Sequence, residues 1–121
     1  MTDYSRFTGA QIQQHCRNNE RTLRIATQQW SLTRQQSFDR AMKYGNQVDA
    51  AEREFQNWRI RFLAPYREGY AHLDHEADRA EADAERSMRA LLDTWMVFKS
   101  VNGPDAHEAM LKQLESVPFK T

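Results

Sequence analysis

The strongest constraint on this sequence is a pair of apolar stripes with helical spacing, one on each side of Pro65. After the proline, the stripe consists of positions three or four residues apart, and all but two of them are apolar. These positions are Tyr70, Leu73, Ala77, Ala80, Ala84, Ser87, Leu91, Trp95, Phe98 and Asn102. Before it, the stripe with the same steps runs through Trp30, Thr33, Ser37, Ala41, Tyr44, Val48, Ala51, Phe55, Trp58 and Phe62. This spacing places side chains on one face of an α-helix. The stripes therefore predict two long helices that pair as an antiparallel hairpin.

Pro65 is the natural bend of this hairpin, because proline disfavours helical geometry at the preceding residue and lacks a backbone donor. Folding there pairs residues whose numbers sum to 131 or 132, such as Ser37 with Trp95 and Thr33 with Phe98. We predict an all-α single domain over residues 1–121. Its helices are expected at about 8–64, 66–102 and 105–115, followed by a tail at 116–121.

Two sites are candidates for a break in the first predicted helix. The run Thr33-Arg34-Gln35-Gln36 has the form of a capping box, but the stripe keeps its phase through it. Gly45-Asn46 is the stronger candidate, since glycine can end a helix and asparagine can cap the next one. The alternative fold is therefore a compact three- to four-helix bundle with a turn at Gly45-Asn46.

Further apolar residues lie away from both stripes. They are Ile25, Leu32, Phe38 and Met42 before the proline and Leu92 and Met96 after it. A two-helix rod has a thin core, and apolar residues on a second helix face indicate a second packing partner. We expect these six residues to form a self-association face and the chain to dimerise into a helical bundle.

Composition suits a folded cytoplasmic protein. Apolar residues make up 40% and charged residues 28% of the 121 residues. No apolar run approaches the ~20 residues of a membrane span, and the N-terminus lacks the apolar core of a secretory signal. The single cysteine, Cys16, cannot form an internal disulfide, which favours a reducing compartment.

Charge is unevenly distributed although the formal net charge is zero. Ten basic against six acidic residues give +4 up to Ala64, and seven against eleven give −4 from Pro65 onward. The acidic excess gathers at 74–85, where Asp74, Asp78, Glu81 and Glu85 form a candidate face for a basic partner. The plainer interpretation is a solvated helix face.

Arg17, Arg21 and Arg24 share a helix face and are the candidate nucleic-acid contacts. Thirteen arginines against four lysines suit phosphate recognition. Zero net charge and the lack of a helix-turn-helix or zinc-finger pattern argue against this function.

Catalytic patterns are missing from the sequence. There is no phosphate-binding glycine loop, nucleophile elbow or metalloprotease helix. His72 and His75 lie near Glu68 and Glu76, but a metal-binding bundle needs Glu-x-x-His twice, and that pattern does not occur. We expect no enzyme activity, metal, cofactor or small-molecule substrate.

The sequence thus predicts an assembly, scaffold or adaptor protein that binds stoichiometrically to itself and to another protein. Two alternatives remain open. One is a small inhibitor or regulator, like those phages encode, that blocks a larger machine with the acidic face. The other is a nucleic-acid-binding protein that uses the arginine face.

Overall fold

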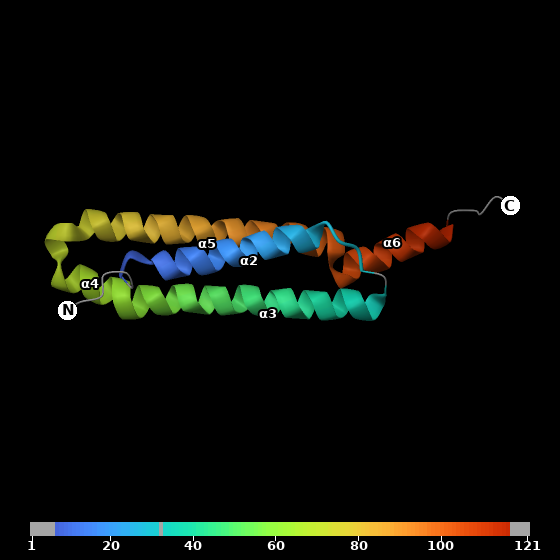
Figure 1. Cartoon of the computed structure of the whole chain (residues 1–121), viewed down its shortest axis with the longest axis horizontal. Helices are drawn as coiled ribbons and strands as arrows, with labels where there is room; N and C mark the ends of the chain where they lie inside the picture. Colours follow the sequence, from blue (N-terminus) through green and yellow to red (C-terminus); the bar gives the residue numbers. More distant parts are fainter. Residues whose placement is uncertain (1–6, 32, 117–121) are drawn as a thin grey trace.

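The computed structural model describes residues 7–31 and 33–116, which form three long helices and no strand (Figure 1). These are α2 (Ala10–Thr27), α3 (Arg34–Trp58) and α5 (Asp74–Asn102). Helices α2 and α5 run in the same direction and α3 runs against them, so the three make an elongated bundle. The prediction of an all-helical chain is confirmed.

The first turn lies at residues 28–33, so the predicted continuous helix at about 8–64 is wrong. At the start of α3, the hydroxyl of Thr33 accepts a hydrogen bond from the Gln36 backbone N–H at 3.0 Å. At the end of α2, the guanidinium of Arg40 donates to the carbonyl oxygens of Ala26 and Gln29. These bonds satisfy backbone groups that a helix end leaves unpaired. A stripe can keep its phase across such a turn, which is why periodicity missed it.

The alternative turn at Gly45-Asn46 is also wrong, because both residues lie inside α3. Glycine at position 45 leaves room for a side chain of the neighbouring helix. A Cβ atom at Gly45 would lie 3.3 Å from Cζ2 of Trp95 on α5, which is a tight contact. Close approach of a bulky ring is a regular use of glycine inside an element.

The second reversal is spread over several short helical segments. Helix α3 continues into a π-helix, η1 (Arg59–Leu63), and then α4 (Ala64–Gly69). The chain reverses after Gly69 and enters η2 (Ala71–Leu73) and α5, which begins eight residues later than the predicted 66. The backbone N–H of Ala64 bonds to the carbonyl of Arg59, five residues earlier. Proline removes a donor and crowds the preceding turn, and the wider π-turn lets the helix continue through Pro65.

This later reversal changes the predicted register between α3 and α5. Tyr44 meets Phe98 with ring centroids 5.4 Å apart, and the Ser37 hydroxyl donates to the Asn102 carbonyl at 3.2 Å. The numbers of such pairs add up to about 140 rather than 131 or 132, so the predicted pairs are wrong. A shift of about eight residues is close to two helical turns, which leaves the same two stripes facing each other.

The core follows the predicted stripes closely. Buried stripe residues are Ser37, Val48, Ala51, Phe55 and Trp58 on α3 and Ala77, Ala80, Ala84, Leu91, Phe98 and Asn102 on α5. Cys16 Sγ lies 3.8 Å from Met88 Sδ across the α2–α5 contact. Trp30, in the turn, is an exception at 54% exposed.

Helix α6 (Pro104–Ser116) follows α5 after one residue and projects past the end of the bundle (Figure 1). Its bounds match the predicted 105–115 within one residue. The predicted tail beyond Ser116 lies outside the described residues. None of the described helices combines the length and apolar character that a membrane span requires.

Candidate functional site

A hollow of about 250 Å³ lies between α3 and α5 at the point where α6 begins, and we name it the α6 groove. Residues from all three helices line it: Phe38, Ala41, Met42, Trp95, Lys99, Gly103, Pro104 and Asp105. Its lining is mostly apolar. Large apolar side chains at a surface hollow are typical of a site that binds another chain.

The rim of the α6 groove is exposed and its floor is packed. Phe38 and Met42 are 52% and 50% exposed, and Met96, which follows the lining residue Trp95 on α5, is 60% exposed. The half-buried Trp95 stacks on Phe98, with ring centroids 5.6 Å apart. The ammonium of Lys99 lies 5.4 Å from the centroid of the Trp95 ring. A firm floor with open apolar edges presents contact area that needs little reordering on binding.

The predicted self-association face is divided by this fold. Phe38 and Met42 line the groove, whereas Leu92 and Met96 lie on α5 outside its lining. Ile25 is 55% exposed and lies nine residues from buried Cys16, which places it on the outer side of α2. Leu32 lies outside the described residues.

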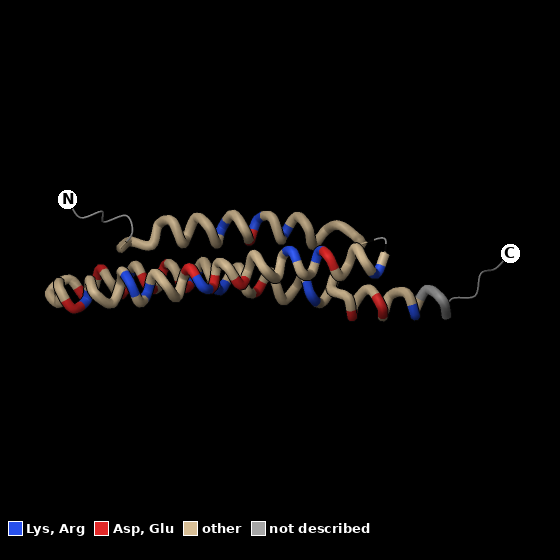
Figure 2. Tube along the Cα trace, turned by 90° about the horizontal axis from the view of Figure 1, so that it is seen from below, with Lys and Arg blue, Asp and Glu red and all other residues tan. Residues whose placement is uncertain are grey.

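The predicted acidic face is partly neutralised within the chain. Arg67 Nη1 lies 2.7 Å from Asp78 Oδ1, and Glu81 lies 3.4 Å from Arg59 and 3.7 Å from Arg67. The hydrogen bond to Asp78 raises the pKa of Arg67. The later reversal of the chain brings both arginines level with these acids. Asp74 and Glu85 are exposed, and Figure 2 shows acidic and basic residues interspersed along the bundle.

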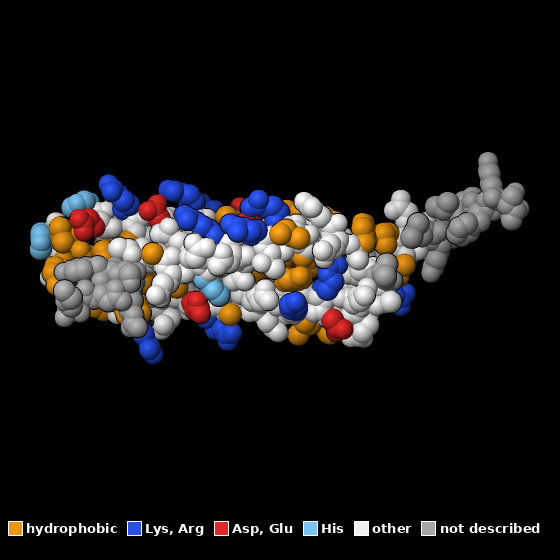
Figure 3. All heavy atoms as spheres, in the orientation of Figure 1, with side chains coloured by type: hydrophobic (Ala, Val, Ile, Leu, Met, Phe, Trp, Pro, Cys, Tyr) orange, Lys and Arg blue, Asp and Glu red, His pale blue; other side chains and the backbone are white. Residues whose placement is uncertain are grey.

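The three predicted nucleic-acid contacts lie on the exposed side of α2. Basic side chains gather along the edge where α2 meets α5 (Figure 3). Arg24 is engaged with Glu20, whose pKa is lowered chiefly by the hydrogen bond from Arg24 and also by one from Thr94. Arg17 donates to Gln13 within its own helix.

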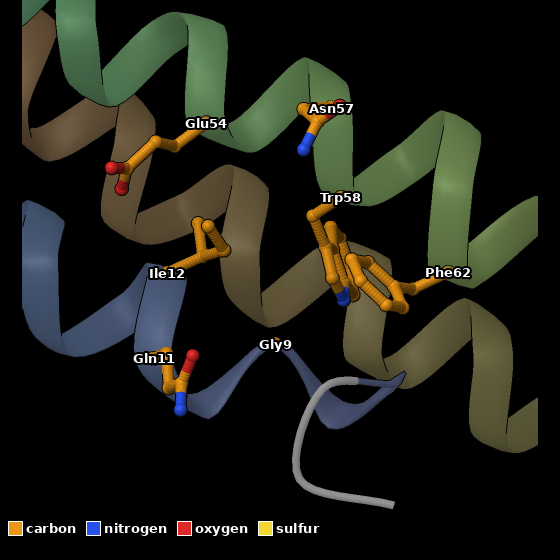
Figure 4. A pocket seen from close by; sticks show the side chains of 7 residues that line it. All are labelled: Gly9, Gln11, Ile12, Glu54, Asn57, Trp58 and Phe62. Carbon is orange, nitrogen blue, oxygen red and sulfur yellow. The ribbon is translucent and has the colours of Figure 1, made fainter. Parts of the chain in front are cut away.

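A second hollow, of about 290 Å³, lies between the start of α2 and the end of α3 (Figure 4). It is lined by Gly9, Gln11, Ile12, Glu54, Asn57, Trp58 and Phe62. The indole N–H of Trp58 donates to the Phe7 carbonyl at 3.1 Å, and the Glu54 carboxylate lies 3.7 Å from His15. Its polar rim can hydrogen-bond to a ligand. No sequence pattern identified this hollow, because its two walls are more than forty positions apart in the chain.

Side chains that could act as nucleophiles or metal ligands are buried or dispersed. Cys16 is fully buried, and burial, with a smaller contribution from the charge of Glu54, raises the pKa of its thiol to about 11. His107 is 2% exposed, and neither ring nitrogen has a hydrogen-bond partner among the described residues. Within residues 7–31 and 33–116, no three His, Cys, Asp or Glu side chains gather as metal ligands.

No protein-family model, curated protein or solved structure matches this chain. The geometry of the surface is therefore the basis for assigning a function.

Proposed function

We propose that this protein is a non-enzymatic interaction module that binds a protein partner stoichiometrically through the end of the bundle where α6 begins. One observation carries the proposal. Nine large apolar side chains are exposed in the described part of the chain, and seven of them lie at this end. They are Trp30, Phe38, Met42, Met96, Val97 and Val101 and, on the outer side of α2 away from the groove, Ile25.

The free energy gained by burying apolar surface explains why this distribution indicates a binding site. Removing apolar surface from water stabilises a complex by about 25 cal/mol per Å². Scattered exposed apolar residues are ordinary, whereas a gathering at one end marks a site of association. The α6 groove is the one hollow within this gathering that three helices line, so we place the contact there.

The two alternative functions receive less support from the contacts. Asp78 and Glu81 are already paired with arginines of the same chain, which weakens an acidic face as a docking site for a basic partner. Arg24 is occupied by Glu20, which reduces the charge that the arginine face offers to phosphates. Inhibition through the acidic face and nucleic-acid binding therefore rank behind the apolar surface.

The test is site-specific photo-crosslinking in the cells that make the protein. A photoreactive amino acid replaces Phe38 or Met42 at the groove, and in matched controls it replaces Ile25 on the outer side of α2 or Ile60 on η1. We expect a protein adduct of defined mass from the two groove positions and none from the controls. Equal adducts at all four positions, or none at the groove, would contradict the proposal.

A further inference from the structure

We infer that the partner is a second copy of this chain, docked end to end so that α6 of each copy lies in the α6 groove of the other. This inference rests on the proposed function and specifies its partner. Three features of the molecule support it: the position of α6, the distribution of charge along α5 and the area that becomes covered.

Helix α6 is joined to its own bundle near its start. Glu108 forms an ion pair with Arg34 of α3 at 2.9 Å, and His107 is buried at the junction. Beyond these residues α6 extends past the end of α3 (Figure 1), and its apolar Met110 and Leu111 are only half-buried. A surface that carries both a projecting helix with two half-buried apolar residues and an apolar groove allows the reciprocal contact that a twofold dimer requires.

One face of α5 is acidic in its first half and apolar near its end. This strip runs through Asp74, Asp78, Glu81 and Glu85, passes Arg89, and continues on the same helix face through Leu92 and Met96. The acids lie at the far end of the bundle, and the apolar residues lie at the α6 end.

The distribution of charge along this strip favours one arrangement of two copies over the others. Parallel copies packed along this strip would bring together the exposed Asp74 and Glu85 of the two copies. Antiparallel copies would bury these acids against Leu92 and Met96. Repulsion between like charges and desolvation of carboxylates oppose both arrangements. An overlap confined to the α6 ends covers the apolar half and leaves both acidic halves in water.

The area to be covered suits a weak dimer. Phe38, Met42 and Met96, each half exposed or more, supply roughly 300 Å² of apolar surface, taking about 200 Å² for a whole large side chain. The open side of α6, about 20 Å long and 10 Å wide, supplies a similar area. The total is on the order of 600 Å² per copy, at the lower end for specific interfaces. We therefore expect a dimer that dissociates on dilution.

The first experiment is light scattering on the full chain over a range of concentrations. The expected mass rises from 14.3 kDa toward twice that value. Phe38→Asp and Met42→Lys, both at the groove, should hold the chain at the monomer mass. Ile25→Lys and Ile60→Lys remove equally exposed apolar groups elsewhere and should dimerise like the unchanged protein. Circular dichroism of each variant checks that it folds.

The second experiment locates α6 in the dimer. A chain with Met42→Cys is mixed with a chain carrying Lys112→Cys, and the mixture is oxidised. We expect a mixed disulfide dimer, with far less product when Ile60→Cys replaces Met42→Cys. Failure of the mixed product while Met42→Cys chains link to each other would overturn the placement of α6.

Failure of this inference is distinguishable from failure of the proposed function. A monomer at all concentrations overturns the second copy as partner. If photo-crosslinking at Phe38 then captures a different protein, the proposed function still stands. Dimers that the two control lysine variants disrupt as fully as the groove variants also overturn the inference.

Discussion

Gly9 precedes α2 with a φ of 72°, in the left-handed region, and it lies against the indole of Trp58. A Cβ atom there would lie 2.9 Å from Cζ2 of Trp58, and the ring is held in place by its bond to Phe7. Both the backbone and the neighbour disfavour a side chain. We expect Gly9→Ala to lower the free energy of unfolding by about 1–3 kcal/mol, measured by urea denaturation.

The matched control is Gly69→Ala. A Cβ atom at Gly69 has nothing within 4 Å, and this residue ends α4. The free energy of unfolding of the Gly69→Ala variant should change little or rise slightly, because alanine restricts the unfolded chain. Equal losses from both substitutions would show that the contact with Trp58 is unimportant.

Cys16 makes stability depend on pH in the alkaline range. In the folded chain its thiol stays protonated up to a pKa of about 11, while in the unfolded chain it ionises near its ordinary value of 9.0. The unfolded state therefore loses its proton first, and the free energy of unfolding should fall between those two values. Unfolding curves across this range measure the effect, and Cys16→Ala should remove that component.

The same burial predicts slow alkylation of Cys16 by a thiol reagent. The thiol should react in denaturant and stay protected in the folded chain at neutral pH. Rapid labelling of the folded chain would contradict its position in the core.

At the scale of elements, Thr33 starts α3 through its hydrogen bond to the Gln36 N–H. Thr33→Ala removes this cap and should lower the free energy of unfolding by about 1 kcal/mol, measured by thermal or urea denaturation. Thr22→Ala is the control, because Thr22 is exposed in the middle of α2 and alanine favours helices. If the two substitutions had the same effect, Thr33 would not be a helix cap.

Helices α2 and α5 are joined by a hydrogen bond from the Thr94 hydroxyl to Glu20 at 3.0 Å. The pKa of Glu20 is lowered, chiefly by its bond with Arg24, so its carboxylate stabilises the fold above its ordinary pKa of 4.5. That contribution is lost as the pH falls through the lowered value. Glu20→Gln should therefore cost about 1 kcal/mol near pH 7 and much less near pH 2, as measured by urea denaturation.

Glu85→Gln is the control for Glu20, since Glu85 is exposed on the outer strip of α5. It should have little effect at either pH. A loss of stability with Glu20→Gln that is the same at both pH values would exclude its carboxylate charge as the cause.

At the scale of the whole molecule, Asn102 connects all three long helices. Its Nδ2 donates to the carbonyl of Thr27 at 2.7 Å, and its own carbonyl accepts from Ser37. Asn102→Ala leaves a carbonyl at the end of α2 without its buried donor and should cost about 1–3 kcal/mol in urea denaturation. The exposed Asn46→Ala is the control and should be near neutral. No loss from Asn102→Ala would contradict the three-helix junction.

Local periodicity accounts for what could be predicted about the core. The stripe residues Val48, Phe55, Leu91 and Phe98 are buried as predicted, and α6 begins just after Asn102-Gly103. These properties depend on residues within a few turns of each other. The groove was predicted only as scattered apolar residues, since Ile25 and Phe38 share a pattern in sequence and are separated in space by the turn at 28–33.

The sequence by itself determined the helical class, the buried face of each helix and the break before α6, because helical spacing and caps are local properties. The tertiary structure decided where the chain turns and which residues pair between helices. A shift by whole turns leaves the same stripes in contact, so apolar burial alone cannot distinguish the registers. The hydrogen bonds from Ser37 to the Asn102 carbonyl and from Asn102 to the Thr27 carbonyl join the three helices in the register observed here.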